Sequence, residues 1–447
     1  MCIPGLSSER RAVLLRRLSL GFAISAFGNV IIGVAGQALS YLVQAYAANL
    51  LGDEDYGRYT VVFAWLDVLM VSAVIGFDRS VVRFVAIARG QDRWSEVYGA
   101  LRVARRSVLV AGAVTTVVLV VAALLVPMDN GLANTFLIGA LVLPAWAVFR
   151  VNSGALGGLK RVAHGRFLVS IARPATWFGV LWVATSVLEL DRTGAMAMSA
   201  HVVTIALMVA VSWFVVARSV PRSDRCVEPD VSRSREWRRI SAQFTVSSAS
   251  RVLVNRADIL IVGMAFGAAE AGVYAVASRL AQLLAFGLSA SNSVVSPLVA
   301  EHAAAGNRRE VQRAVYQSSL ISTASAIVIG FVTLLASDFL LGIFGERFVD
   351  GRPIFVVLAV GQVVNALAGP VGIALNMGGH ERTNSRILMV SLLIYAAVAV
   401  PAIIWFDVIG MAVVTAAIRV LRSLWMWWEV RRRMGVNSSV FVMGSKL

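Results

Sequence analysis

The chain is poor in charged residues. Asp, Glu, Lys and Arg make up only 15% of its 447 residues, whereas a soluble domain carries about 25%. Hydrophobic residues account for 58% of the chain, and the mean hydropathy is +0.76. Apolar segments of roughly 20 residues recur throughout, as in membrane-spanning helices and unlike the ten-residue alternation of a membrane β-barrel. The composition therefore excludes a soluble protein and predicts an all-α integral membrane protein.

Residues that build disulfides and metal centres are also scarce. The only two cysteines, Cys2 and Cys226, fall in segments that we expect in the cytoplasm, so no disulfide is expected. The four histidines have no second ligand at metal spacing, and His201, alone in an apolar span, is interpreted as a hydrogen-bonded structural residue. No Walker-type glycine loop occurs, and no connection is long enough for a soluble catalytic domain. We predict a protein that is not an enzyme, has no metal or cofactor, and draws energy from a gradient, the membrane potential or the substrate's own concentration difference.

An internal repeat organises what is present. The sequence LGDEDYGRY at Leu51 to Tyr59 returns as FGAAEAGVY at Phe266 to Tyr274, with the spacing Gly-x4-Gly-x-Tyr in both. Long apolar segments flank each copy, so we predict two similar halves, each beginning with a helix, a tight glycine turn and a second helix. We expect the tyrosine of each copy to lie in the lipid headgroup zone.

The first copy of the repeat holds an acidic triplet, Asp53-Glu54-Asp55. Such a triplet is compatible with a metal-assisted glycosyltransferase. The second copy has Ala268-Ala269-Glu270 instead and shares only the last acid. The triplet is therefore interpreted as part of a surface loop.

Twelve spans can be delimited by charges and by Gly or Pro. The first six lie near residues 20–50, 60–87, 107–127, 132–158, 166–188 and 195–217, and the second six near 240–266, 273–300, 314–336, 353–378, 385–405 and 408–428. We predict an N-terminal six-helix lobe (1–217), a basic linker (218–239) and a C-terminal six-helix lobe with a basic tail (240–447). Because six is even, the two repeats are parallel and surround a central cavity.

The basic loops predict the orientation. Lys and Arg gather at both termini and in every second connection, while the opposite connections hold only Arg58, Arg192, Arg347 and Arg352. By the positive-inside rule, both termini and the linker lie in the cytoplasm. Topology and attraction to anionic membrane lipids thus account for the net charge of +16, and no nucleic acid is expected as a partner.

Arginines inside the predicted spans mark candidate site residues, because an Arg at the bilayer centre costs about 2.5–3.5 kcal/mol. Several lie close to span ends, where snorkelling explains them: Arg83, Arg150, Arg173, Arg279 and Arg422. Arg79, Arg251 and Arg256 lie deeper, and Arg419 is a weaker case.

The seventh span carries a polar stripe. Ser247, Arg251, Asn255 and Asp258 fall within about 80° on one helical face, with Arg256 beside it. We predict that this stripe lines a water-filled cavity. The alternative is that Arg251 and Asp258 only pair to lock helices together. The remaining candidates for cavity residues are Arg79, Arg83, Arg279, Gln37, Gln44, Gln282, Gln362 and Asn365.

The two repeat copies, with RSVVRFVA at 79–86 and Asn255-Arg-x-Asp258 beside them, resemble the polysaccharide exporter branch of the multidrug/oligosaccharidyl-lipid/polysaccharide exporter superfamily. The resemblance covers the whole chain in span number and repeat arrangement. It implies two six-helix lobes around a cationic cavity that opens alternately to either side. It also implies transport of an undecaprenyl-diphosphate-linked oligosaccharide across the bacterial cytoplasmic (inner) membrane, with a coupling cation or proton and a polysaccharide polymerase as further partners.

Other functions stay open at this point. A peptidoglycan-precursor flippase of the same superfamily usually has two more spans. A multidrug cation antiporter commonly has an Asp in its first span, and none occurs in this one. A membrane glycosyltransferase or polymerase would be expected to have a large outer loop, and the longest here, Ser337 to Arg352, is short.

Overall fold

The computed structural model describes residues 8–221 and 228–440. Within these ranges the secondary structure is helical and contains no strand, which confirms the all-α prediction. Cys2 and Cys226 lie outside the described residues.

The first half begins with α1, which contains two helical segments joined at a break. The helices and the one π-helical turn of this half are α1 (Ser8–Val74), α2 (Phe77–Gly90), α3 (Trp94–Leu125), α4 (Asn130–Ala140), α5 (Val142–Gly158), α6 (Val162–Phe167), η1 (Leu168–Ala172), α7 (Arg173–Ser186) and α8 (Gly194–Arg218). Two of the helix starts have side-chain caps: Asp129 accepts from the Leu132 amide at 3.3 Å, and Thr193 accepts from the Met196 amide at 3.2 Å. Each cap satisfies an amide that the first helical turn leaves unpaired.

The second half repeats this style of construction. Its elements are α9 (Ser234–Phe266), α10 (Ala268–Leu283), α11 (Phe286–Ala304), α12 (Arg308–Leu335), α13 (Ser337–Gly342), the 3-10 turn η3 (Glu346–Gly351), α14 (Arg352–Ala368), α15 (Val371–Met377) and α16 (Glu381–Met434). Helix α16 has 54 residues and would span about 80 Å if straight. It is interrupted at Phe406 and Asp407, where the predicted eleventh and twelfth spans meet.

The described residues contain seven helices long and apolar enough to cross a membrane, or up to nine if each bent pair is one span. The bent pairs are α4 with α5, at 42°, and α10 with the first part of α11, at 51°. Helix α9 is not among the seven. The multi-pass membrane architecture is thus confirmed, and twelve spans remain a prediction.

The sequence repeat is also a repeat of backbone geometry. Gly52 interrupts α1 at φ 77° and ψ 176°, and Gly267 separates α9 from α10 at φ 88° and ψ −179°. This region of backbone space is essentially restricted to glycine. The two copies meet directly, because a Cβ on Gly57 would lie 1.9 Å from the carbonyl oxygen of Ala268. Close backbone packing of this kind requires glycine.

The tyrosines of the repeat do not lie in an exposed zone. Tyr59 is 1% exposed and Tyr274 is fully buried, so both side chains pack inside the protein, and their depth in the headgroup zone stays a prediction. Each tyrosine lies one turn or more beyond its glycine break, where the chain has already turned back into the helix bundle.

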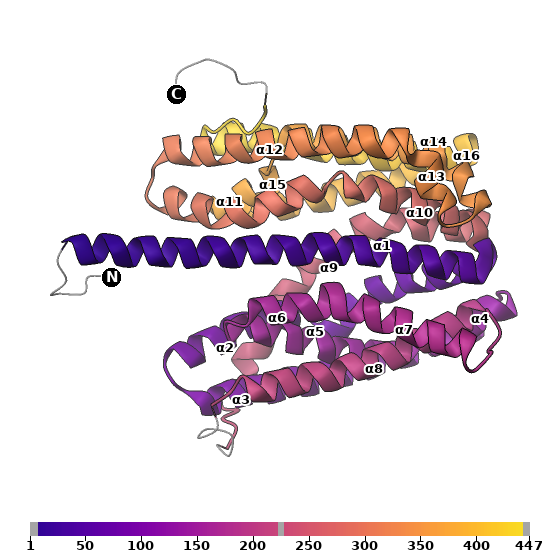
Figure 1. The fold of residues 1–447 in the computed structure, drawn as a ribbon, viewed down its shortest axis with the longest axis horizontal. Helices are drawn as coiled ribbons and strands as arrows, with labels where there is room; N and C mark the ends of the chain where they lie inside the picture. Colours follow the sequence, from indigo (N-terminus) through magenta and orange to yellow (C-terminus); the bar gives the residue numbers. More distant parts are fainter. Residues whose placement is uncertain (1–7, 222–227, 441–447) are drawn as a thin grey trace.

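Figure 1 shows how the halves are arranged. The long first segment of α1 runs through the middle, with α10 to α16 gathered on one side and α2 to α8 on the other. Helix α9 packs against α1, α2 and α16, and it thereby touches both groups. Toward the end of the bundle where α1 breaks, about three turns before Gly52, Tyr41 donates to the carbonyl of Leu340 at 2.9 Å. At that end the side chain of Arg347 contacts both Asp53 and Glu270 at 3.1 Å.

Candidate functional site

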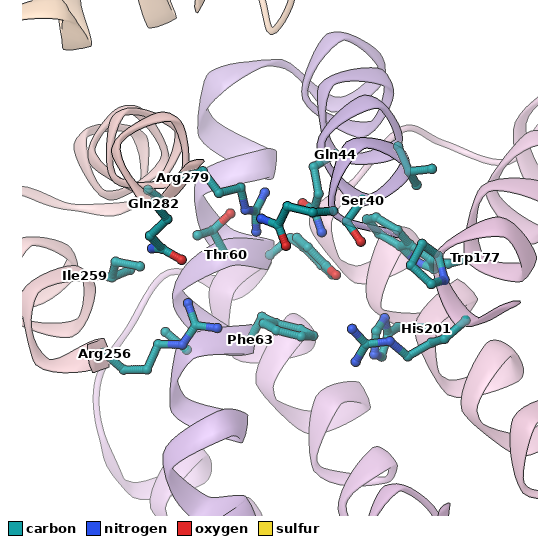
Figure 2. A pocket seen from close by; sticks show the side chains of 17 residues that line it. Ser40, Gln44, Thr60, Phe63, Trp177, His201, Arg256, Ile259, Arg279 and Gln282 are labelled. Carbon is teal, nitrogen blue, oxygen red and sulfur yellow. The ribbon is translucent and has the colours of Figure 1, made fainter. Parts of the chain in front are cut away.

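A cavity of about 220 Å³ lies where helices of the two halves meet. It is lined by both segments of α1 and by α7, α8, α9 and α10. Figure 2 shows side chains of α9 and α10 on one side and Gln44, Trp177 and His201 on the other, with Thr60 and Phe63 between them. The lining residues are Gln37, Ser40, Val43, Gln44, Tyr59, Thr60, Phe63, Ala64, Arg173, Pro174, Trp177, His201, Arg256, Ile259, Ala275, Arg279 and Gln282.

Three arginines give the cavity its positive charge, and their partners differ. Arg256 forms an ion pair of 2.7 Å with Asp67. Arg279 donates to the hydroxyl of Tyr56 at 2.8 Å, and that hydroxyl donates in turn to Gln44 at 3.2 Å. Only one of these two guanidiniums is therefore compensated by a carboxylate among the described residues.

Arg173 is the third cation. Its guanidinium lies over the ring of Trp146 at 5.8 Å, and it forms no ion pair with a carboxylate in the described part of the chain. It lines the cavity and also a neighbouring hollow of about 360 Å³. In that hollow Arg150 pairs with Asp78 at 2.9 Å. Among the described residues, the two hollows together thus hold two positive charges without an ion-pair partner, Arg173 and Arg279.

The position of Arg173 depends on a local irregularity. The π-helical turn η1 ends at Ala172, and Pro174 lies in the first turn of α7. A π-helical turn inserts extra backbone and rotates the residues that follow it. Helix α1 lies against this turn at Gly36, where a Cβ would approach the carbonyl oxygen of Ser170 to 2.6 Å. Arg173 was expected to snorkel from a span end, and the structure instead turns it into the cavity.

An aromatic wall closes the cavity on the side of α7 and α8. The ring of Tyr59 stacks on Trp177 with centroids 5.1 Å apart, and the rings of Phe63 and Trp146 lie 5.3 Å and 5.6 Å from His201. His201 is buried, and neither of its ring nitrogens has a hydrogen-bond partner among the described protein groups. Its interpretation as a hydrogen-bonded structural residue is wrong.

Several predicted site residues do meet at the cavity. Arg256, Arg279, Gln37, Gln44 and Gln282 all line it. They come from α1 and from the consecutive helices α9 and α10, which are distant from α1 in sequence and adjacent to it in the fold.

On α9 the side that faces the cavity differs from the predicted stripe. Arg256 and Ile259 line the cavity, whereas Arg251 and Asn255 are exposed elsewhere on the helix. Helix α9 packs between α1 and α16, and this packing fixes which side faces the cavity. Ser247 belongs to the same helix, but its side chain is outside the described set.

Asp258 turns into the second half. Its carboxylate accepts from the Ile259 amide at 2.9 Å and from the Tyr274 hydroxyl at 3.4 Å. The Tyr274 hydroxyl also lies 3.2 Å from the Thr415 hydroxyl, which lies 3.1 Å from that of Tyr395. The pair of Arg251 and Asp258, which was the alternative interpretation of the stripe, does not form.

The remaining candidates lie away from the cavity. Gln362 is buried, and Asn365 accepts from the Ser423 hydroxyl at 2.8 Å. Arg83 is exposed and borders a small hollow at the start of α9 with Glu236, and Arg79 is half-buried on the same helix as Arg83.

The start of α9 is fixed by ion pairs. Arg233 contacts Glu236 at 2.9 Å and Glu96 at 3.6 Å. The hydrogen bond from Arg233 holds the pKa of the Glu236 carboxyl below its usual value. The amide of Asp230 donates to the Ser95 carbonyl at 3.0 Å, so the end of the linker is tied to α3.

The three acids of the acidic triplet in the first repeat copy are also paired with arginines. Arg58 contacts Glu54 at 2.6 Å and Asp55 at 3.2 Å, and Asp53 contacts Arg347. All three acids of the triplet are thus engaged with arginines. Among the described residues no group of three or more His, Cys, Asp and Glu could hold a metal ion.

Comparison with known proteins defines the class. The fold resembles that of solved membrane transporters of the MOP superfamily, and several helices are long and apolar enough to cross a membrane. Residues 24–303 match the family described as polysaccharide biosynthesis protein, and the chain belongs to this family. Residues 244–401 match the MatE family.

A curated relative is the "Probable low-salt glycan biosynthesis flippase Agl15" of Haloferax volcanii. It is 23% identical over 190 residues, which is 42% of this chain and 40% of the relative. The match therefore spans less than half of that relative's length.

The fold also resembles solved transporters. An inward-facing multidrug resistance MATE family transporter has a TM-score of 0.71 and 14% identity, covering 91% of this chain and 98% of that one. An outward-facing one has a TM-score of 0.66 and 12% identity, covering 92% and 95%. A Pyrococcus furiosus transporter, titled for a "reverse polarity of binding pocket" that "suggests different function", has a TM-score of 0.63 and 13% identity, covering 92% and 95%.

Proposed function

We propose that this protein moves a lipid-linked oligosaccharide, carried on a polyprenyl diphosphate, across the cytoplasmic membrane for surface polysaccharide synthesis. The observation that carries the proposal is the pair of uncompensated guanidiniums, Arg173 and Arg279, in a cavity between the halves. A diphosphate diester carries about two negative charges, and charge-assisted bonds from guanidinium to phosphate are among the strong ones. The family membership and the flippase relative agree with such a substrate.

The polar side chains of the cavity suit the sugar part of such a substrate. Gln37, Ser40 and Gln282 offer donors and acceptors for hydroxyl groups. The cavity of about 220 Å³ is smaller than the roughly 300–1,000 Å³ of usual ligand sites. We infer that it widens when substrate enters and that the polyprenyl tail stays in the lipid.

We propose twelve spans in two lobes, residues 1–217 and 240–447, with both termini cytoplasmic. The seven helices, the two bent pairs and the breaks inside α1 and α16 support eleven crossings. The polar helix α9 would be the twelfth. In this arrangement the exposed Arg251 and Asn255 face a water-filled approach to the cavity, because a lipid-facing Arg is costly.

We propose alternating access coupled to a cation or proton gradient. The contacts of Arg347 and Tyr41 close the molecule at the end where the repeat copies meet. Of the similar transporters, one has an inward-facing and another an outward-facing conformation, which is compatible with the same motion here. A polysaccharide polymerase is the partner expected to use the product.

The test removes the two uncompensated charges. In cells that lack their own flippase, Arg173→Gln and Arg279→Gln should each lower surface polysaccharide by about ten- to a hundredfold, as expected for loss of one charged hydrogen bond of roughly 1.5–3 kcal/mol. The double variant should lower it further. Arg192→Gln, on the exposed connection between α7 and α8, is the matched control and should export normally.

Membrane levels of each variant are measured beside export. Normal export by the double variant at normal levels would remove these arginines from the substrate site and the proposal would lose its main support.

A multidrug cation antiporter is the second candidate. The multidrug transporters among the structural neighbours and the aromatic wall of the cavity favour it. Against it stands the unpaired positive charge, which repels cations. If cells expressing the protein extrude a cationic dye, and Arg173→Gln increases that extrusion, the antiporter is the better assignment.

A further inference from the structure

His201 is a buried polar group that the fold does not use. Its side chain is 4% exposed, and neither Nδ1 nor Nε2 has a hydrogen-bond partner among the described protein groups. The buried ring of Trp177 and the ring of Phe63 pack around it. Because polar atoms in a protein interior are normally paired, such an atom in a ligand cavity points to the ligand as its partner.

The same wall contains a second orphan group. The hydroxyl of Tyr59 is buried without a hydrogen-bond partner in the described part of the chain, and its ring stacks on Trp177. The wall therefore combines flat aromatic faces with at least three unused polar atoms, on Tyr59 and His201. Figure 2 shows Trp177 and His201 at one end of the cavity, away from Arg256 and Arg279.

The polar atoms and the aromatic rings of this wall indicate which kind of ligand fits it. A neutral imidazole offers one donor and one acceptor, which matches adjacent hydroxyl groups. The C–H faces of a sugar ring are apolar and suit aromatic rings, while its rim is polar. Arg173 lies over Trp146, a ring that also contacts His201, so a cation stands next to this end of the cavity.

We propose that the wall of Tyr59, Phe63, Trp177 and His201 binds the sugar ring attached directly to the diphosphate, with Arg173 on the phosphate beside it. This assignment rests on the proposed function and goes beyond it, because it makes His201 a determinant of sugar recognition. His201 distinguishes a glycosylated lipid from the bare lipid diphosphate. An aromatic cage also suits an organic cation, but the unpaired Arg173 disfavours one.

The experiment measures binding of two probes to the full-length protein in nanodiscs. One probe is a polyprenyl diphosphate that carries a single hexose, and the other is the same lipid without the sugar. The wild type should bind the glycosylated lipid about tenfold more tightly, as expected for one or two additional hydrogen bonds.

Two variants separate the sugar from the phosphate. His201→Phe keeps the aromatic packing and removes both polar atoms, so it should bind both lipids with the affinity of the bare lipid. Arg173→Gln should weaken both lipids by the same factor. His201→Asn retains a donor and an acceptor and should recover part of the preference. His380→Phe, in a hollow at the start of α16, is the matched control and should keep it fully.

The outcomes are distinguishable. A wild type that binds neither lipid contradicts the proposed function itself. A wild type that binds both lipids equally, or a His201→Phe protein that retains the preference, overturns the assignment of His201 alone. Tight binding of tetraphenylphosphonium that is retained in His201→Phe, which keeps the aromatic faces, would assign the wall to an organic cation instead. Thermal unfolding of each variant confirms that it is folded, and His201→Leu, which also removes both polar atoms, serves if His201→Phe is not.

Discussion

Tyr59 and Tyr274 hold equivalent places in the two copies of the repeat, and their surroundings differ in kind. Tyr59 stacks on Trp177, and its hydroxyl is without a hydrogen-bond partner among the described residues. Tyr274 is equally buried, but its hydroxyl lies within hydrogen-bond distance of Asp258 and Thr415. One copy thus presents an aromatic wall to a cavity, while the other is tied into a polar network.

The difference shows how a duplicated unit takes on two roles. The backbone template is shared, because Gly52 and Gly267 have the same unusual dihedral angles. The side chains around the tyrosines are not shared. In the second half the hydrogen bonds join α9, α10 and α16, which stabilises the packing of these helices. In the first half the unused polar atoms are available to a ligand.

The largest effect is expected where the two copies touch. Gly57→Ala should prevent folding of most of the protein, because the added Cβ would lie 1.9 Å from the carbonyl oxygen of Ala268. Overpacking of this kind costs about 1–3 kcal/mol or more. The measurement is the amount of monodisperse protein recovered in detergent.

Gly272→Ala tests whether the two copies are equivalent at this contact. Its Cβ would meet the nearest atom, Cα of Gly57, at 3.1 Å, so a smaller loss is expected. Gly179→Ala, with nothing within 4 Å, is the control and should be recovered normally. Equal recovery of the Gly57 and Gly179 variants would show that the close contact is absent in the protein.

A smaller effect should distinguish the tyrosines themselves. Tyr274→Phe removes a hydroxyl from a buried network, and leaving Asp258 and Thr415 with one partner fewer should cost about 1–3 kcal/mol. Tyr59→Phe removes a hydroxyl with no described partner and should leave stability unchanged or slightly higher. Thermal unfolding of both variants beside the wild type is the measurement. A similar loss of stability in both would contradict the proposed division of roles.

Much of the fold follows from local signals in the sequence. The glycines of the repeat predicted tight turns. The helices do break at Gly52 and Gly267, in a backbone conformation that glycine tolerates best. The last two predicted spans, at residues 385–405 and 408–428, meet at the break near Phe406. Polar residues within apolar spans also predicted that Arg256, Arg279 and Gln282 belong to an interior site.

The rest depends on the rotation of helices about their axes. The sequence of α9 alone does not show whether the face with Arg251 or the face with Arg256 points to the interior. The packing of α9 against α1 decides which of these two faces lines the cavity. The π-helical turn before Arg173 leaves no signature that periodicity can detect. The sequence did contain one signal for the position of Arg256. Asp67 is an acid within an apolar span of the first half, and it pairs with Arg256, which lines the cavity.

The smallest effect concerns Arg347, a side chain that contacts both copies of the repeat. Its guanidinium reaches Asp53 of the first copy and Glu270 of the second, each at 3.1 Å, although half of the side chain is exposed. Exposed ion pairs of this kind contribute only about 0–1 kcal/mol each. Arg347→Gln should therefore leave folding intact and, for a combined contribution of the two pairs of about 1 kcal/mol, shift the closed population at this end by about fivefold. Spin labels at Leu190 and Phe339, exposed residues next to α8 and in α13, would report opening as a longer interlabel distance.

Arg352→Gln is a matched control, because Arg352 is as exposed as Arg347 but pairs with Asp338 within its own half. An opening shift in the Arg347 variant alone would show that this contact between the copies holds the end closed, whereas equal distance distributions in both variants would assign the closure to the glycine contact of Gly57 and Ala268.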